Sequence, residues 1–383
     1  MNGIIYLDHA AATPLDERVF AVMQPYFSDL FYNPTAAYQP ARDVRVAYED
    51  ARHRLAMAIG GARDEIIITA GATESVNVAL HGILSSGGHA VIGATEHAAI
   101  RGATGPFPHA VAAVDAHGIV TPETIKNVIT DETRVVSIAL AESELGTIQK
   151  LRDVATVIDE VRDQRLRGGN TTPIYLHSDA SQGAGLLDIN VARLGVDLLT
   201  LNAGKIYGPK QVGLLWVRRG IILEPLIRGG GQERGIRSGT ENVAGTIGFA
   251  LALETAQNKR HQESKRLASL RDNLQDQLTQ AIPDLVVNGS PKRRLQSHLH
   301  VSVPGLDAER AVFALESRGV LVATGAACAA NKGTRSATLI AVGMGDDLAD
   351  GSLRFTLGRL NSEEDITAAA TAIIDVIKTE RTR

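Results

Sequence analysis

The chain contains very little cysteine: Cys328 is the only one in 383 residues. A single thiol cannot form an internal disulfide or a metal site with several cysteine ligands, so the sequence gives no sign of an oxidising compartment, and we expect no metal. Cys328 lies among small residues in TGAACAANKG (324–333), between an apolar run and a helix-like segment. Free cysteine is often a small buried hydrophobe, but on a loop it is also a candidate nucleophile.

Long apolar runs and strong net charge are also missing. No apolar stretch approaches the roughly 20 residues that a membrane-spanning helix needs. The N-terminal stretch MNGIIYLDHAAATP lacks the basic segment and long apolar segment of a signal peptide. The net charge of −4 gives no electrostatic reason to expect nucleic acid or an anionic membrane as a partner. We therefore expect a cytoplasmic protein that binds neither membrane nor, directly, nucleic acid.

The central part of the chain alternates short β-branched runs with helical patterns. An early helix is predicted from apolar residues at helical spacing between 41 and 59, and Gly60 and Gly61 should end it. Strands joined by helices are typical of an α/β fold with a largely parallel sheet, in which ligands bind at the carboxyl ends of the strands. The predicted strands are 65–69, 89–94, 134–140, 173–178, 196–201 and 213–218.

The pattern changes after about residue 250. Leucines at 267, 270, 274 and 278 predict a long helix, and short strands and helices follow it. The last helix should begin at Ser362, which forms a capping box with Asp365. Because 383 residues are long for one core, two domains are expected. We predict a large α/β domain over 16–258 and a smaller α+β domain made of 1–15 and 259–383.

Polar residues follow several of the predicted strands. Gly71, Ala72 and Thr73 precede a helix start, where backbone N–H groups could bind a phosphate, although a simple tight turn fits equally. Asp179 and Gln182 follow the strand 173–178, and Asp179 could equally cap the next helix.

Lys205, His97 and Arg354 each have two interpretations. Lys205 follows an apolar strand; it is either an ordinary solvated lysine or an amine nucleophile. His97 is either structural or able to lie on a cofactor ring and transfer protons. Arg354 alternates with Leu353 and Phe355, so it lies either on an exposed strand face or where it can bind a carboxylate in bidentate fashion.

Asp179 and Lys205 together suggest one cofactor. Pyridoxal phosphate (PLP) enzymes need a lysine for covalent attachment, a carboxylate for the pyridine nitrogen and a phosphate cradle. The glycine-rich nucleotide motifs and the His-Glu-x-x-His zinc motif are absent from the sequence. These absences count against nucleotide and zinc chemistry.

The chain resembles the cysteine desulfurases of the NifS/IscS type, a branch of the class V aminotransferase-like PLP enzymes, over essentially its whole length. The resemblance implies the PLP-dependent transferase fold (fold type I) with a mainly parallel seven-stranded sheet. It rests on YLDHAAATP (6–14), GATES (71–75), TEH (95–97), DASQ (179–182), KIYGPK (205–210), GGGQERGIRSGTENV (229–243), the cysteine loop and RFTLGR.

The resemblance also implies residue roles. Lys205 would bind PLP covalently, and His97 would stack on its ring. The other cofactor contacts would come from Asp179, Gln182, Thr73, Ala72, Ser143, Asn202 and, from a neighbouring subunit of a homodimer, Thr240. Arg354 would bind the substrate carboxylate, with Asn33 and Ala12 nearby. Cys328 would be the catalytic thiol and Lys205 and His97 the other catalytic residues.

The implied reaction converts L-cysteine to L-alanine and leaves the sulfur on Cys328 as a persulfide. A sulfur-acceptor protein, either an iron–sulfur scaffold or a thiolation enzyme, would then take it. The same residues leave two alternatives open. One is a selenocysteine lyase, or another PLP lyase or aminotransferase, in which Cys328 is dispensable. The other is a degenerate, non-catalytic partner protein with the same fold.

Several positions depart from the family's motifs. Where members have His-x-Asn-Asn-Glu-x-Gly, this chain has LAESELG (140–146), which places Ser143 at the cofactor-facing asparagine and Glu142 beside it. Asn202 replaces a phosphate-binding hydroxyl, and Gly204 replaces a histidine. We expect weaker PLP retention unless Asn202 supplies a donor. An extra carboxylate at Glu142 should point away from an anionic site.

Overall fold

The computed structural model describes residues 3–325 and 335–382. Its strands are β1 (Ile5–Tyr6), β2 (Ile66–Thr69), β3 (His89–Gly93), β4 (His109–Ala112), β5 (Thr133–Ser137), β6 (Tyr175–Asp179), β7 (Leu198–Asn202), β8 (Gly213–Val217), β9 (Val286–Val287), β10 (His298–Ser302), β11 (Val320–Leu321), β12 (Ala323–Thr324) and β13 (Ser352–Thr356). Its α-helices are α1 (Glu17–Met23), α2 (Pro25–Ser28), α3 (Gln39–Ile59), α4 (Ala72–Leu84), α5 (Ala98–Thr104), α6 (Pro122–Lys126), α7 (Leu151–Arg167), α8 (Val191–Leu194), α9 (Val243–Ala281), α10 (Ala308–Glu316), α11 (Ala337–Ala341), α12 (Asp346–Asp350) and α13 (Glu363–Glu380). Three short 3-10 helices are η1 (Arg63–Glu65), η2 (Ala203–Lys205) and η3 (Glu233–Gly235).

The predicted seven-stranded sheet is confirmed, with strand order β2-β8-β7-β6-β5-β3-β4. The pairs from β7 through β4 are parallel, whereas β8 runs antiparallel to both of its neighbours. All six predicted strands are present. The seventh, β4, was missed because this edge strand reads HAVA and buries only Ala112, so no apolar run marks it.

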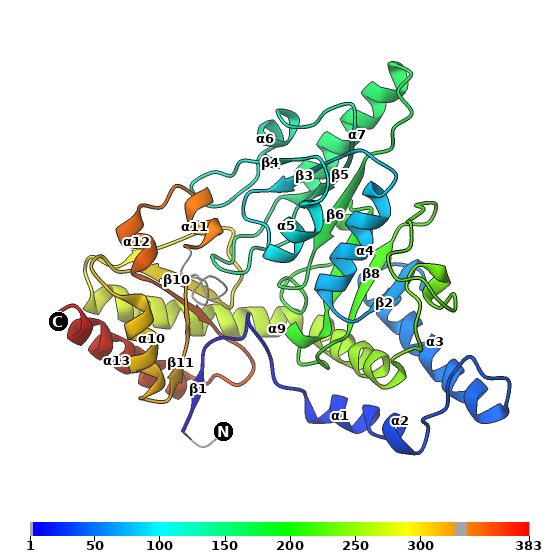
Figure 1. The fold of residues 1–383 in the computed structure, drawn as a ribbon. Helices are drawn as coiled ribbons and strands as arrows, with labels where there is room; N and C mark the ends of the chain where they lie inside the picture. Colours follow the sequence, from blue (N-terminus) through cyan, green and yellow to red (C-terminus); the bar gives the residue numbers. More distant parts are fainter. Residues whose placement is uncertain (1–2, 326–334, 383) are drawn as a thin grey trace.

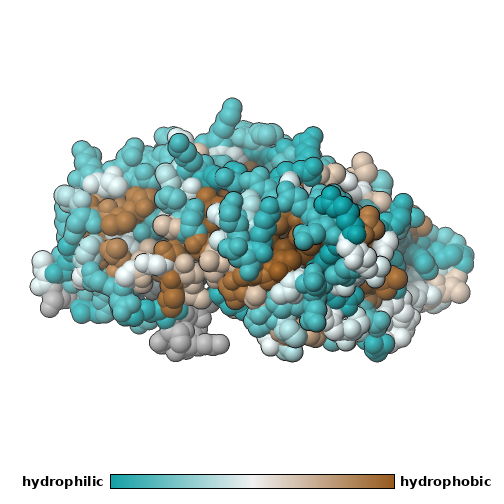
Figure 2. All heavy atoms as spheres, turned by 90° about the horizontal axis from the view of Figure 1, so that it is seen from above, coloured by the Kyte–Doolittle hydropathy of each residue, from teal (hydrophilic) through white to brown (hydrophobic). Residues whose placement is uncertain are grey.

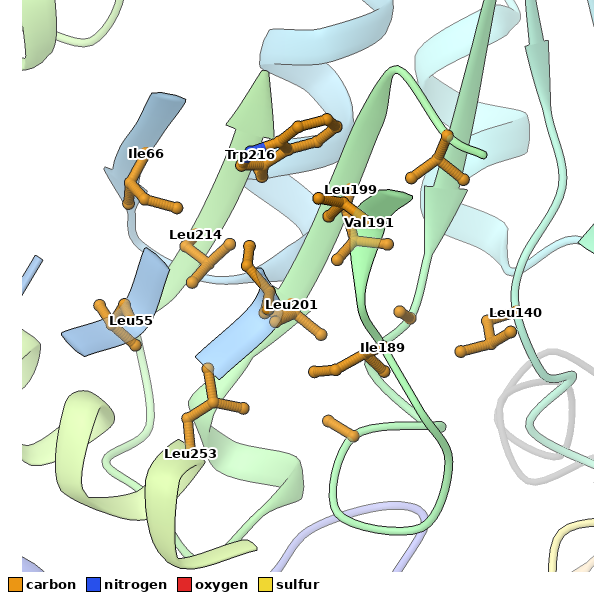
Figure 3. Close-up of a cluster of buried hydrophobic side chains, with 14 of the residues drawn as sticks. Leu55, Ile66, Leu140, Ile189, Val191, Leu199, Leu201, Leu214, Trp216 and Leu253 are labelled. Atoms are coloured by element: carbon orange, nitrogen blue, oxygen red, sulfur yellow. The ribbon is translucent and has the colours of Figure 1, made fainter. Parts of the chain in front are cut away.

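Helices cover both faces of this sheet, as in other doubly wound α/β folds (Figure 1). One face packs against α4 and α5 through alternate strand residues such as Ile92 and Leu215. The opposite face packs against α3, α7 and α9. Figure 3 shows part of the packing on this opposite face, where Leu199 and Leu201 of β7 and Leu214 of β8 face Leu55 of α3 and Leu253 of α9.

A second core surrounds the four-stranded sheet β12-β13-β10-β9. The 39-residue helix α9 runs from the large sheet into this part of the molecule, where its leucines at 267, 270, 274 and 278 are buried (Figure 1). The N-terminal strand β1 pairs in parallel with β11, so the first residues lie with the last third of the chain. Seen from above, hydrophilic side chains dominate the surface, and apolar ones show mainly between them (Figure 2).

Two local sequence signals are confirmed. Gly60 ends α3 with a left-handed backbone at φ 72°, a conformation that glycine adopts without steric cost. Ser362 accepts a hydrogen bond from the Asp365 N–H, and the Asp365 carboxylate accepts one from the Ser362 N–H. This capping box starts α13 where the sequence predicts it.

Glu233, at the start of η3, connects the motif 229–243 to the core. Its buried carboxylate accepts hydrogen bonds from Arg52 Nη1 at 2.7 Å, from Tyr48 Oη at 2.7 Å and from the Ile68 N–H at 2.7 Å. Glu233→Ala removes the buried counter-charge of the Arg52 guanidinium and leaves it only the more exposed Glu49, whose Oε1 lies 3.5 Å from Arg52 Nε. We expect the free energy of unfolding, measured by urea denaturation, to fall by about 3–5 kcal/mol.

The control for this prediction is Glu224→Ala. Glu224 Oε2 lies 3.8 Å from Arg228 Nη2 in an exposed ion pair. Such pairs contribute about 0–1 kcal/mol to the free energy of unfolding. If both variants lost equally little stability, Glu233 would not anchor the motif.

Candidate functional site

The predicted site residues follow the ends of neighbouring strands. His97 comes after β3, Ser143 after β5, Asp179 ends β6, and Lys205 follows β7. Because β3, β5, β6 and β7 are parallel, their carboxyl ends lie along one edge of the sheet. This edge is where α/β folds bind ligands.

Lys205 lies at the end of η2 and reaches the N-terminal segment. Its Nζ donates to the carbonyl oxygens of Ala10 at 2.7 Å and Ala11 at 2.8 Å. Gln182 Nε2 also donates to the Ala10 carbonyl, at 3.1 Å. Ala12, the next residue of this segment, accepts a hydrogen bond from Tyr6 Oη through its carbonyl. The structure thus brings Lys205, Gln182 and Ala12 together.

His97 lies close enough to both Asp179 and Lys205 to interact with them electrostatically. Burial lowers the pKa of His97; the nearby Asp179 carboxylate raises it, and Lys205 lowers it. His97 Nδ1 accepts a hydrogen bond from the Ala99 N–H and so caps α5, which places the proton of the neutral ring on Nε2. Asp179 Oδ1 accepts from the Ser181 N–H. His97 therefore has the structural role that the sequence left open, as a helix cap. Asp179 holds a turn instead, because no described helix begins between β6 and Val191.

The residues at the start of α4 suit a phosphate. Gly71 precedes this 13-residue helix at φ 134°, and no side chain among the described residues caps the helix. Its first N–H groups therefore favour an anion. Ala72 and Thr73 form the first turn, and Thr73 is exposed. Asn202 Oδ1 accepts from the Gly204 N–H, which is compatible with its amide group acting as a donor. An amine, a carboxylate and an uncapped helix together fit PLP.

Arg354 of β13 is only 6% exposed, so the exposed-face interpretation is wrong. Its Nη2 donates to Asp8 Oδ1 at 2.7 Å, and its Nη1 donates to the Ser143 carbonyl at 3.2 Å. Asp8 was not identified as a site residue from the sequence, although it lies within the motif YLDHAAATP. Only the fold shows that it meets Arg354, because 346 residues separate the two.

Three predicted site residues are not brought to this edge by the described contacts. Asn33 is exposed, and its Oδ1 accepts from the N–H and Oγ1 of Thr35. Thr240 is also exposed, as expected of a residue assigned to a neighbouring subunit's site. Cys328 lies outside the described residues.

A cavity of about 220 Å³ adjoins Lys205 at the junction of the two cores. Gln182 and His9 line it together with Tyr207 and Arg359. His9 was also missed: it is buried, and burial lowers its pKa to about 4. Its Nδ1 lies 3.1 Å from the Thr356 carbonyl, so the neutral ring donates from Nδ1.

Glu96, next to His97, is a buried carboxyl whose proton state should affect stability. Its Oε1 accepts from the Ala139 N–H at 2.8 Å, and burial raises its pKa from 4.5 to about 8. A group whose pKa is higher in the folded protein contributes stability that is complete below its unfolded pKa. That contribution is lost as the pH rises through about 8.

Glu96→Gln removes this pH dependence and keeps an oxygen for the Ala139 N–H. Relative to wild type, we expect little change in the free energy of unfolding at about pH 5 and a gain of about 2–4 kcal/mol at about pH 9. Urea denaturation at the two pH values measures it. The exposed Glu316→Gln should show no such difference, and a gain for Glu96→Gln that is equal at both pH values contradicts the prediction.

Comparisons with known proteins agree with this geometry. Residues 5–368 match the family model described as aminotransferase class-V. The cysteine desulfurase IscS of Dictyoglomus turgidum is 37% identical, and the alignment covers 100% of this chain and 96% of that protein. A solved NifS-like protein superimposes with a TM-score of 0.90 at 28% identity, covering 98% of this chain and 100% of that one. A structure titled SspA in complex with cysteine has a TM-score of 0.79 at 30% identity, with 92% and 98% covered.

Proposed function

Because the chain belongs to the class-V aminotransferase family, and within it to the cysteine desulfurases, we propose that it takes sulfur from L-cysteine with PLP as cofactor and releases L-alanine. The observation that carries this proposal is the convergence of Lys205, Asp179 and an uncapped helix N-terminus at one sheet edge. A similar fold, SspA, has been solved in complex with cysteine.

The cofactor-binding residues have distinct tasks in this proposal. Lys205 would hold PLP covalently and carry a proton to or from the substrate, while Asp179 would pair with the pyridine nitrogen and Gln182 with the ring hydroxyl. His97 would stack on the ring, with Ser143 beside it. Ala72, Thr73 and Asn202 would hold the phosphate. When bound, PLP withdraws electrons from the substrate and so weakens its carbon–sulfur bond.

Arg354 and Cys328 act on the substrate itself. Arg354 binds the carboxylate through the N–H groups of its guanidinium that the contacts with Asp8 and the Ser143 carbonyl leave over. Ala12 would lie beside the amino acid; Asn33 is assigned there by the resemblance alone, because no described contact brings it to this edge. The Cys328 thiolate attacks the substrate sulfur, the carbon–sulfur bond breaks, and its electron pair takes a proton to give alanine. Cys328 then carries the second sulfur as a persulfide.

The assembly is part of the same proposal. The protein forms a homodimer in which Thr240 of one subunit contacts the phosphate bound by the other. A sulfur-acceptor protein for iron–sulfur cluster assembly or thiolation removes the persulfide sulfur. The two hydrophobic cores support a division into a large domain, 16–258, and a small domain, 1–15 with 259–383. None of the helices in residues 3–325 and 335–382 is long and apolar enough to cross a membrane.

The test is the fate of L-cysteine on the PLP-loaded protein without reductant. We expect one alanine for each sulfur retained in the first turnover, with the tryptic peptide 319–332 heavier by one sulfur atom. Alanine without that mass gain would indicate a lyase that does not use the thiol. Turnover of L-selenocysteine alone would indicate a selenocysteine lyase. No alanine from either substrate would contradict the proposal.

A further inference from the structure

The turn that follows β5 contains Glu142, a carboxylate where relatives of the NifS/IscS type have an amide. Glu142 is buried, at 4% exposure, and its carboxylate folds back on its own turn. Oε1 accepts from the Glu144 N–H at 2.8 Å, and Oε2 accepts from the Leu145 N–H at 2.6 Å. Thr338 Oγ1 adds a longer contact of 3.4 Å to Oε1. Both carboxylate oxygens are therefore directed at the backbone of this turn, which reduces the cost of an extra carboxylate near an anionic site.

The same turn contacts the small sheet through its backbone. The Ser143 carbonyl accepts from Arg354 Nη1 at 3.2 Å. Gly146, at φ 72°, lies so close to β10 that an added Cβ would come within 2.5 Å of His298 Cβ. Since β10 pairs with β13, the turn rests on the strand next to the one that carries Arg354.

Arg354 is thus held between two acceptors from distant parts of the chain. Asp8 Oδ1 accepts from Nη2 and the Ser143 carbonyl from Nη1, while the buried Nε has no partner among the described residues. A guanidinium held by an acceptor at each Nη has a fixed orientation. Its orientation therefore depends on where the Ser143 carbonyl lies.

We propose that Glu142 is a positioning residue for the substrate carboxylate. By binding two backbone N–H groups, it fixes the turn that places the Ser143 carbonyl, and this carbonyl orients Arg354. The inference rests on the proposed function, because it takes Arg354 to bind the carboxylate of the amino acid. The two carboxylate oxygens satisfy the N–H groups of Glu144 and Leu145 separately, one oxygen for each.

The electrostatics are consistent with this arrangement. Burial raises the pKa of Glu142, whereas the two N–H groups and the nearby Arg354 lower it. The charge of the carboxylate is directed at N–H dipoles of its own turn. It therefore repels an anionic ligand at Arg354 less than an outward-facing carboxylate would.

The test compares two ligands of the PLP-loaded protein that cannot transfer sulfur. L-alanine carries the carboxylate, and ethylamine is the same molecule without it. Binding is followed by the change in absorbance of the bound cofactor. Glu142→Ala should weaken the affinity for L-alanine by roughly 10-fold or more, the range expected when a hydrogen bond to a charged group is lost. The affinity for ethylamine should fall by less than about 2-fold. Glu142→Asn should recover most of the L-alanine affinity, because asparagine can still accept from the Glu144 N–H.

The matched control is Glu65→Ala. Glu65 is another carboxylate that holds a turn: it accepts from the N–H groups of Ala62 and Arg219 and from Trp216 Nε1. It lies at the opposite end of the sheet, where Ile66 pairs with Trp216. Glu65→Ala removes a similar set of local hydrogen bonds. It should leave the affinities for L-alanine and for ethylamine unchanged.

The outcomes separate this inference from the proposed function. Equal losses for L-alanine and ethylamine, or a loss no larger than that in Glu65→Ala, would overturn the role of Glu142. If the wild type prefers L-alanine to ethylamine but forms no alanine from L-cysteine, the proposed sulfur transfer is wrong. The binding measurements on the Glu142 variants then still test the role of Glu142. If the wild type shows no such preference, Arg354 is not a carboxylate site and the inference is wrong.

Discussion

Cys328→Ala should abolish persulfide formation and lower alanine production from L-cysteine by at least about 10³-fold, a loss in the range seen when a nucleophile is removed. The thiolate is a strong nucleophile toward sulfur, and the chain contains no other cysteine that could replace it. The measurement is alanine formation together with the mass of the peptide 319–332. Binding of L-alanine, which needs no thiol, should stay at the wild-type level.

Cys328→Ser is the matched variant, because it keeps the size of the side chain and replaces only the sulfur. A serine hydroxyl is far less acidic than a thiol and does not attack sulfur effectively, so we expect the same loss as in Cys328→Ala. Alanine production close to the wild-type rate in either variant would contradict the desulfurase proposal. It would favour the lyase in which this thiol is dispensable.

The fold was largely predictable because its signals are local. Each central strand is a short apolar run, and these runs alternate with amphipathic helices, so the chain order alone indicates an α/β sheet. Gly60 and Ser362 set helix boundaries through their own backbone conformation and hydrogen bonds. The edge strand β4 lacks such a signal, since its outward residues need not be apolar.

The site was predictable where its residues follow strands. Asp179 and Lys205 come directly after β6 and β7, so the parallel sheet places them side by side. The partners of Arg354 were not predictable in this way. Asp8 reaches it only because the N-terminal segment lies beside β13, where Asp8 forms a bridge with Thr356. No residue spacing in the sequence predicts that the N-terminal segment contacts β13.

The buried carboxyls show the same limit. The sequence does not show that Glu142 and Glu96 are buried, yet burial raises the pKa of both. Whether such a side chain faces solvent, a ligand or its own backbone depends on the turn that carries it. The sequence indicates that Glu142 is unusual, and the two hydrogen bonds to Glu144 and Leu145 explain how the chain accommodates it.

Lys205→Ala should remove covalent cofactor attachment and lower turnover of L-cysteine by about 10⁴-fold or more, since a residue that acts as nucleophile and proton carrier contributes to several steps. Its Nζ donates to the Ala10 and Ala11 carbonyls, so the loss of the side chain also frees the N-terminal segment. Borohydride reduction followed by mass analysis of the intact chain measures attachment. The wild type should gain the mass of the reduced cofactor, and the variant should not.

Lys205→Arg separates the chemistry from the structural contacts. Arginine keeps the positive charge and can donate to the Ala10 and Ala11 carbonyls, but its guanidinium stays protonated and does not form the covalent link. We therefore expect the stability of Lys205→Arg to remain near that of the wild type, while its turnover falls as far as that of Lys205→Ala. If Lys205→Arg kept substantial activity, the amine would serve only to tether residues 10–11, and the covalent role of Lys205 would be wrong. If both variants are equally inactive but only Lys205→Ala is less stable, the amine carries the chemistry. The hydrogen bonds to the Ala10 and Ala11 carbonyls then hold the N-terminal segment.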